Sequence, residues 1–142
     1  MTIEVRPAAF DDADSFRQVM AHAFGFDPNE KTHERFQTMW EPDRSRCAYD
    51  DGKMVATLGT FSLQLSVPGA VLPAGGTSMV AVLPSHRRQG LLRKLMVAHL
   101  QDVDEREEPL AALWASESSI YGRFGFGTAS SSVDIKAPTA YG

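Results

Sequence analysis

Hydrophobic residues in the first forty positions recur first with the period of a strand and then with that of a helix. Ile3 and Val5 alternate with polar neighbours, which predicts a short strand ending at Pro7. A helix is then predicted from a cap at Asp11 or Asp12 to Gly25, with apolar positions at Phe16, Val19, Met20 and Ala23. A second, shorter helix is predicted from Pro28 to just before Pro42, with an apolar stripe of Phe36, Met39 and Trp40.

The middle of the chain has the pattern of a hairpin followed by further strands. Residues 46–49 and 54–67 are predicted to be antiparallel strands joined by a turn at Asp50-Asp51-Gly52. Pro68-Gly69 predicts a second turn. Val71-Leu72 and Thr77 to Leu83 are then predicted to carry the chain through the middle of the sheet.

The last third alternates between helical and strand patterns. A long helix opens after Pro84, and its predicted core face comprises Leu92, Leu95, Met96, Leu100 and Val103. The apolar run from Leu110 to Trp114 is typical of a strand buried on both faces. A brief helix is predicted from Ser116 to Phe124, ended by Gly125. The final strand is predicted from Gly127 to Lys136, with Val133 and Ile135 facing inward.

This order of elements predicts the fold class. Strand, helix and strand across residues 77–114 imply a right-handed parallel crossover, whereas the hairpin before it is antiparallel. We therefore expect an α/β (α+β) fold with a mixed, mostly antiparallel central sheet.

Composition narrows the class of protein and of partner. The chain has 142 residues, enough for one domain, and its 43% hydrophobic and 23% charged residues are ordinary for a globular protein. A net charge of −4 argues against general binding to nucleic acid or to anionic membranes. A single cysteine, Cys47, favours a reducing cytoplasm, and we see neither a secretory leader nor an apolar run long enough to span a membrane. Residues 137–142 directly follow the last predicted strand, as in a domain cut from a longer protein.

The charges on the long helix have the opposite polarity to the one its dipole favours. Basic residues gather at its start (His86, Arg87, Arg88, Arg93 and Lys94) and acidic ones at its end (Asp102, Asp104, Glu105, Glu107 and Glu108). This arrangement costs roughly 0.3–1 kcal/mol per misplaced charge, and a bound polyphosphate is its simplest explanation. Arg87-Arg88-Gln89-Gly90 would then cradle the phosphates, the alternative being a solvated basic turn.

A second motif, from Trp114 to Gly127, follows the predicted buried strand. Tyr121 lies just past the carboxyl end of that strand, where parallel sheets usually place their chemistry. The alternative is a tyrosine that anchors the segment with its hydroxyl in water. The four histidines share no ligand spacing, so no metal site is expected, and neither a P-loop nor a nucleophile elbow is present.

Taken together, these segments resemble the GNAT superfamily of N-acetyltransferases. The acyl-CoA motif of that superfamily, Q/R-x-x-G-x-G/A, occurs as residues 87–92, with Leu92 in place of the final small residue. Residues 65–75, 80–93 and 114–127 look like the N-terminal domain of enhanced-intracellular-survival-type acetyltransferases. The resemblance covers essentially the whole chain and is densest from about residue 57 to 128.

The resemblance implies a role for each matching residue. The pantetheine arm of acetyl-CoA, the co-substrate, would pair with the strand at Met79, Val80 and Val82. Its phosphates would lie on Arg87 and Arg88 and on the N–H groups of Gly90 and Leu91. Ser116 and Ile120 would flank the thioester. Tyr121 would be the general acid that protonates the departing thiolate. A backbone N–H near Val80, where neighbouring strands splay, would stabilise the oxyanion.

We therefore expect an acetyl-CoA-dependent N-acetyltransferase that modifies a primary amine of a small cationic molecule or a protein lysine. We expect the walls of the acceptor pocket to include Phe24, Phe26, Asp27, Glu30 and Trp40. Full-length members of this branch add a second acetyltransferase-like domain and a sterol-carrier-like domain, form hexamers, and use their terminal carboxylate as general base. The alternatives are a non-catalytic acyl-CoA-binding or assembly domain that needs those further domains, and an α/β domain that binds another phosphorylated ligand.

Overall fold

A computed structural model describes residues 2–136, apart from the side chains of Glu30 and Thr32. The strands and α-helices follow one another in the order β1 (Ile3–Pro7), α1 (Ala13–Phe24), α2 (Glu30–Met39), β2 (Arg46–Asp50), β3 (Lys53–Val67), β4 (Ala70–Val82), α3 (Leu91–Glu105) and β5 (Leu110–Leu113). Short 3-10 helices precede α1 and α3, namely η1 (Phe10–Asp12) and η2 (Pro84–His86), and two more follow β5, namely η3 (Ser118–Ile120) and η4 (Gly122–Phe124). The predicted positions of the two N-terminal helices and of the β2–β3 hairpin are confirmed.

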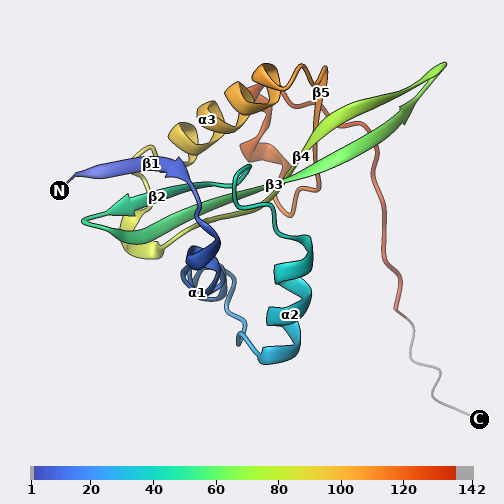
Figure 1. The fold of residues 1–142 in the computed structure, drawn as a ribbon. Helices are drawn as coiled ribbons and strands as arrows, with labels where there is room; N and C mark the ends of the chain where they lie inside the picture. The colour runs from blue at the N-terminus through green and yellow to red at the C-terminus, as the bar shows by residue number, and fades with distance from the viewer. Residues whose placement is uncertain (1, 137–142) are drawn as a thin grey trace, which may run out of the picture.

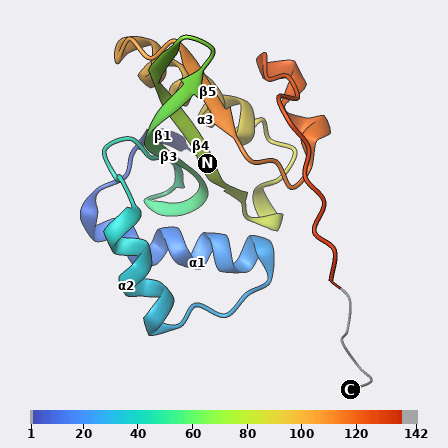
Figure 2. The same cartoon turned by 90° about the vertical axis from the view of Figure 1, so that its right-hand side faces the viewer.

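The strands form one sheet in the order β1-β2-β3-β4-β5. Neighbours are antiparallel except for β4 and β5, which are parallel and are joined through α3. Helices α1 and α2 lie against one face of this sheet and α3 lies against the other (Figures 1 and 2). The predicted mixed, mostly antiparallel sheet with a parallel strand–helix–strand unit is therefore confirmed.

Each face of the sheet carries its own apolar core, because successive strand residues point to opposite faces. On the α1 and α2 face, Phe16 packs against the rings of Phe36 and Trp40 at centroid distances of 5.6 and 5.1 Å. On the α3 face, Leu95 and Met96 are fully buried. Because a buried cluster packs on each face, the sheet holds the residues at its edges in fixed positions.

The buried face of α3 differs from the face that its apolar pattern predicts. Leu91 and His99 are buried, whereas Leu92 and Leu100 are only partly buried. The His99 ring is fully buried between two threonine hydroxyls, with Nδ1 2.9 Å from Oγ1 of Thr60 and Nε2 2.7 Å from Oγ1 of Thr77. The buried face of α3 is thus partly polar, which an apolar pattern does not reveal.

A charged cluster lies beside this histidine, beneath the end of α3. Arg44 is 1% exposed and donates to both carboxylate oxygens of Glu108, at 2.9 and 2.7 Å. Its Nε also donates to Asp102, which in addition accepts from Arg46 and Arg106. Every ionised group in this cluster has an opposite charge beside it, as burial of charge requires.

Two predictions for the last third of the chain are wrong in detail. The residues of β5 are only partly buried, because among the described residues β5 pairs with β4 alone, and Trp114 lies beyond it at 88% exposure. Residues 127–136 form no strand: they pair with no other strand of the described chain, and Val133 and Ile135 are more than four-fifths exposed. Residues 137–142 lie outside the described part of the chain.

Two further predictions need correction. The segment from 116 to 124 consists of η3 and η4 rather than one helix. Val71 is exposed because the ends of β3 and β4 extend as a two-stranded arm beyond the other strands (Figure 1), rather than through the middle of the sheet. None of the helices in residues 2–136 is long and apolar enough to cross a bilayer.

Candidate active site

Strand β4 contains a bulge at the residues that the resemblance assigns to the co-substrate. The β3–β4 register pairs Gly59 with Ser78 and Thr57 with Ala81, so Met79 and Val80 both fall opposite one residue of β3 and have no one-to-one register partner there. Met79 has a φ of 50°, in the left-handed region. Its side chain occupies the space left by the missing side chain of Gly59, where a Cβ would overlap it. The bulge breaks the regular pairing of backbone groups at this point of the strand.

The other edge of β4 is open beyond the same point. Strand β5 pairs with β4 only from Ala74 to Thr77, and it ends at Leu113. The chain then turns away from the sheet into η3 and η4 (Figure 2). From Ser78 to Val82, the β5 side of β4 consequently has no strand partner among the described residues. An extended ligand can pair with such an edge as an added strand.

This open edge forms one wall of a cavity of about 720 Å³. The start of α3 and the η2 turn form a second wall, and η3 and η4 form a third. Ala23 and Phe24, at the end of α1, also line it, although α1 lies on the opposite face of the sheet from α3. The cavity is therefore lined by residues from both faces of the sheet, at the part of β4 that extends beyond its pairing with β5.

The start of α3 presents backbone donors and positive charge to the cavity. Gly90 caps the helix with a φ of 75°, a left-handed conformation that favours glycine. The first bond within the helix runs from Lys94 N to the Gly90 carbonyl, so the three preceding N–H groups have no partner within the helix. Five basic side chains line the cavity: His86, Arg87, Arg88, Arg93 and Arg123. This combination of free amides and guanidinium groups suits a polyphosphate.

Tyr121 lines the opposite wall. Its ring is half-buried and meets Phe126 edge-on, with centroids 6.2 Å apart. Burial raises the pKa of the phenol above its ordinary value of 10, and the nearby Glu117 carboxylate raises it further. The phenol is therefore protonated at neutral pH and can act as a proton donor.

The structure brings almost all of the predicted site residues together. Apart from Met79, whose side chain lies against Gly59, every one lines this cavity: Val80, Val82, Arg87, Arg88, Gly90, Leu91, Ser116, Ile120 and Tyr121. Sequence reasoning did not assign Arg123, although it lies only two residues after Tyr121 in the same motif.

The predicted acceptor walls come together less well. Phe24 lines the cavity, whereas Trp40 is buried against Phe16 and Phe36 and does not line it. Phe26 and Asp27 lie outside the cavity lining, and the side chain of Glu30 lies outside the described part of the structure. Aromatic and acidic residues near the first two helices are thus too general a signal to locate an acceptor pocket.

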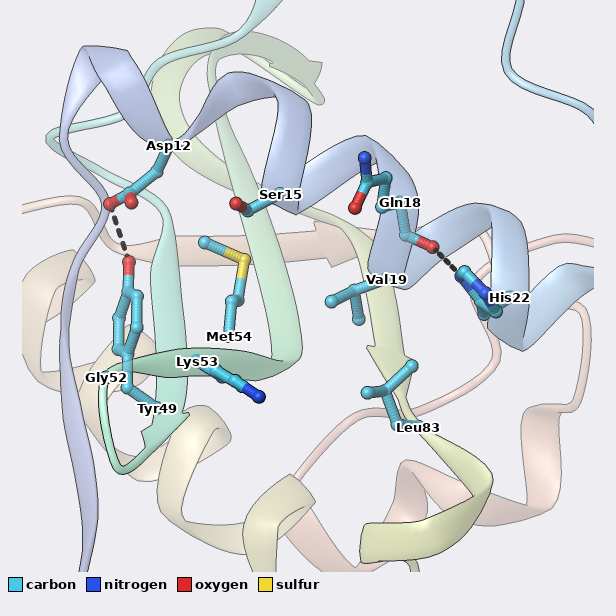
Figure 3. A pocket seen from close by; sticks show the side chains of 10 residues that line it. All are labelled: Asp12, Ser15, Gln18, Val19, His22, Tyr49, Gly52, Lys53, Met54 and Leu83. Atoms are coloured by element: carbon cyan, nitrogen blue, oxygen red, sulfur yellow. Dashed lines mark hydrogen bonds between the residues drawn. The ribbon is translucent and has the colours of Figure 1, made fainter.

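A smaller hollow of about 340 Å³ lies between α1 and the β2–β3 hairpin (Figure 3). Its floor is apolar, with Val19, Met54 and Leu83 pointing into it. Among its described lining residues there is no arginine, and Asp12 contributes a carboxylate. These features do not suit a polyphosphate, so the larger cavity is the candidate co-substrate site.

Comparisons with known proteins identify the family to which the chain belongs. The model of the family described as "Acetyltransferase (GNAT) domain" matches residues 4–129. A Streptomyces avermitilis protein named an uncharacterized N-acetyltransferase is 44% identical over 130 residues, which make up 89% of this chain and 32% of that protein. The N-acetyltransferase Eis of Mycobacterium tuberculosis is 51% identical over 70 residues, or 49% of this chain and 17% of that protein.

The fold is shared with a solved relative. The crystal structure of Eis1 from Mycobacterium abscessus superposes with a TM-score of 0.77 and 28% sequence identity, covering 89% of this chain and 31% of that one. The chain thus spans about a third of the length of the curated relatives it matches over most of its length. With the family match extending over nearly all of its residues, the chain belongs to the GNAT acetyltransferase family.

Proposed function

We propose that this domain transfers the acetyl group of acetyl-CoA to a primary amine, carried by a small cationic molecule or by a protein lysine. One observation carries the proposal: the open edge of β4, the basic start of α3 and Tyr121 all line a single cavity. An anionic, extended thioester needs these three features together: donors for its phosphates, a strand edge for its arm, and an acid for its sulfur.

In this proposal acetyl-CoA lies in the cavity in one direction. The diphosphate would lie at the start of α3, on the guanidinium groups of Arg87 and Arg88 and the N–H groups of Gly90 and Leu91. The pantetheine arm would run along the open edge of β4 from Val82 towards the bulge at Met79 and Val80. The thioester would then lie between Ser116 and Ile120, beside Tyr121.

Each residue at the far end of the cavity has a part in the proposed reaction. The neutral amine nitrogen attacks the thioester carbonyl, and a backbone N–H near Val80 stabilises the oxyanion that forms. The carbon–sulfur bond then breaks, and Tyr121 donates its phenolic proton to the departing thiolate. The proton released by the amine passes to a base, which the resemblance assigns to the terminal carboxylate of full-length members. The acidic body of the chain would attract cationic acceptors.

A second candidate is a non-catalytic acyl-CoA-binding or assembly domain. The observation that favours it is the length of the relatives, of which this chain spans about a third. Robust single-turnover acetylation by the 142-residue chain would exclude the non-catalytic alternative.

We propose that residues 1–142 form the N-terminal acetyltransferase domain of a longer, homo-oligomeric cytoplasmic protein.

Calorimetry with CoA and with ATP tests the co-substrate. We expect CoA to bind, and Arg87→Ala/Arg88→Ala to weaken binding by at least about 100-fold, since each guanidinium–phosphate contact is charge-assisted. The control Lys31→Ala/Arg35→Ala removes the same charge from exposed positions of α2 and should leave CoA affinity nearly unchanged. Unchanged CoA affinity in the Arg87/Arg88 variant would refute the proposed phosphate site, and preference for ATP would favour another phosphorylated ligand.

Tyr121→Phe tests the chemistry separately from binding. Loss of a general acid should lower turnover by about 10²–10⁴-fold. CoA affinity should stay within about twofold, because the ring still packs against Phe126. Turnover equal to that of the parent chain would exclude Tyr121 as the acid.

A further inference from the structure

The turn between β4 and α3 is joined to a distant part of the fold through one histidine. Nε2 of His86 lies 3.0 Å from Oδ2 of Asp50, which is 36 residues earlier in the chain. Nδ1 of the same ring lies 2.8 Å from Oγ of Ser85. A carboxylate can only accept, so Nε2–H donates to Asp50, and Nδ1 is left to pair with the Ser85 hydroxyl. Both ring nitrogens therefore have partners within the protein.

The other hydrogen bonds of residues 84–90 stay within the turn and its flanking elements. Arg87 Nε donates to the Val82 carbonyl at 3.4 Å, and Gln89 Nε2 donates to the Ser85 carbonyl at 3.4 Å. Both of these bonds are long and exposed. At the start of the turn, the Leu83 N–H donates to the Val55 carbonyl of β3 at 2.9 Å. Beyond Leu83, within the described part of the chain, the His86–Asp50 bond is the one hydrogen bond that ties residues 84–90 to another region of the sheet.

The backbone of Asp50 is held in a tight turn. It ends β2 at the β2–β3 turn, whose next residues, Asp51 and Gly52, have φ values of 47° and 80°, as in a tight two-residue hairpin turn. The preceding residue, Tyr49, is 3% exposed and donates its hydroxyl proton to Asp12 at 2.7 Å (Figure 3). The end of the hairpin is thus tied to the start of α1.

His86 lies between the cavity and Asp50 in the contacts that it makes. Its side chain lines the co-substrate cavity, whereas Asp50 is not among the lining residues, and both side chains are 18% exposed. Because both ring nitrogens already have protein partners, the effect of His86 on a ligand would pass through the turn.

We propose that His86 is a positioning residue for acetyl-CoA, which holds the phosphate-binding turn in register with the β2–β3 hairpin through Asp50. This inference rests on the proposed function. It predicts that the affinity for CoA depends on the bond between the side chain at position 86 and Asp50, although neither residue needs to touch the phosphates.

Two substitutions at position 86 separate the two ring nitrogens. His86→Gln places an amide donor near the position of Nε2, within reach of Asp50. His86→Asn places it near Nδ1, where it can bond Ser85 but not reach Asp50. By calorimetry with CoA on the 142-residue chain, we expect His86→Asn to weaken binding about tenfold and His86→Gln less than about threefold, given the strength of hydrogen bonds to charged groups. His22→Ala is the matched control, since that exposed imidazole bonds only to its own helix.

A double-mutant cycle with Asp50→Ala tests the coupling. If His86 acts through Asp50, His86→Asn/Asp50→Ala should bind CoA no more weakly than His86→Asn alone. Losses that multiply, or equal affinities for the Asn and Gln variants, would overturn the inference. So would variants that melt at lower temperature but bind CoA as the parent does, because that result describes a purely structural contact.

The same measurements distinguish failure of this inference from failure of the proposed function. If the parent chain binds CoA and the His86→Asn and His86→Gln variants bind it equally well, the positioning role alone is refuted. If the parent chain does not bind CoA, the proposed function is refuted, and the positioning role with it.

Discussion

The buried His99 should make the stability of this domain depend on pH over a defined range. Burial lowers the pKa of its imidazole to about 4, and the positive charge of Arg44 contributes in the same direction. In the unfolded chain the same ring has its ordinary pKa of about 6.5. The folded protein therefore keeps His99 neutral at pH values where the unfolded chain binds a proton.

The size of the effect follows from these two values. Each unit of difference between the folded and unfolded pKa values corresponds to about 1.4 kcal/mol of stability. The difference between 6.5 and about 4 therefore contributes about 3 kcal/mol to the free energy of unfolding. Because the folded-state pKa is lowered, this stability is fully present above about pH 6.5. It is lost progressively as the pH falls towards 4. Typical domains are stable by about 5–15 kcal/mol, so the loss is measurable.

The assay is urea unfolding at several pH values across this range. We expect the free energy of unfolding to fall by about 1.4 kcal/mol per pH unit at the steepest part. His99→Gln should be less stable at neutral pH, since it cannot reproduce both bonds to Thr60 and Thr77, and its pH dependence should be flatter. His22→Ala, which removes an exposed histidine, should keep the parent slope.

Two buried or half-buried carboxylates have pKa values shifted away from this range. Hydrogen bonds and nearby arginines outweigh burial and lower the pKa of Asp12 and Asp102 below 3.8, so the stability that these carboxylates contribute is lost only in more acidic solution. A parent chain with constant stability between about pH 6.5 and 4 would refute the assignment. A His99→Gln variant with the full parent slope would refute it equally.

Three further outcomes are expected. Arg44→Met leaves a buried carboxylate unpaired and should cost about 3–5 kcal/mol in urea unfolding at neutral pH; a cost below about 1 kcal/mol would contradict the buried cluster. Gly75→Ala places a Cβ 2.5 Å from Cγ2 of Val103 and should cost about 1–3 kcal/mol, whereas Gly127→Ala, with open space around it, should cost little. Cys47 is fully buried and burial raises its pKa to about 12, so thiol reagents should label it only after unfolding, and fast labelling of the folded chain would contradict this.

Local patterns predicted the elements that depend on their own residues. The alternation at Ile3 and Val5, the glycine at 25 and the turn at Asp51-Gly52 each act over a few positions, and each element formed as expected. The basic turn and the Tyr121 motif could also be predicted to lie together, because a parallel strand–helix–strand unit brings the start of its helix and the end of its second strand to the same edge.

The failures concern features that depend on distant partners. An apolar run at Leu110–Trp114 is the same whether a strand has one neighbour or two, so it could not show that β5 pairs with β4 alone. His99 reads as an ordinary helix residue until Thr60 and Thr77 are placed on either side of it. The Asp50–His86 bond joins residues 36 positions apart, and no spacing rule connects them.

The bulge in β4 changes the face parity of the strand. Before it, odd-numbered Thr77 points to α3, where it bonds His99. After it, even-numbered Val80 and Val82 pack on the α3 side, while Ala81 joins the core beneath α1. Deleting Met79 would restore a uniform ladder in which Val80 alone faces Leu58, and it would leave Val80, Ala81 and Val82 on the faces that they occupy now. The extra residue is therefore not needed to sort side chains between the two cores, and its effect is confined to the interrupted pairing of β4 beside the cavity.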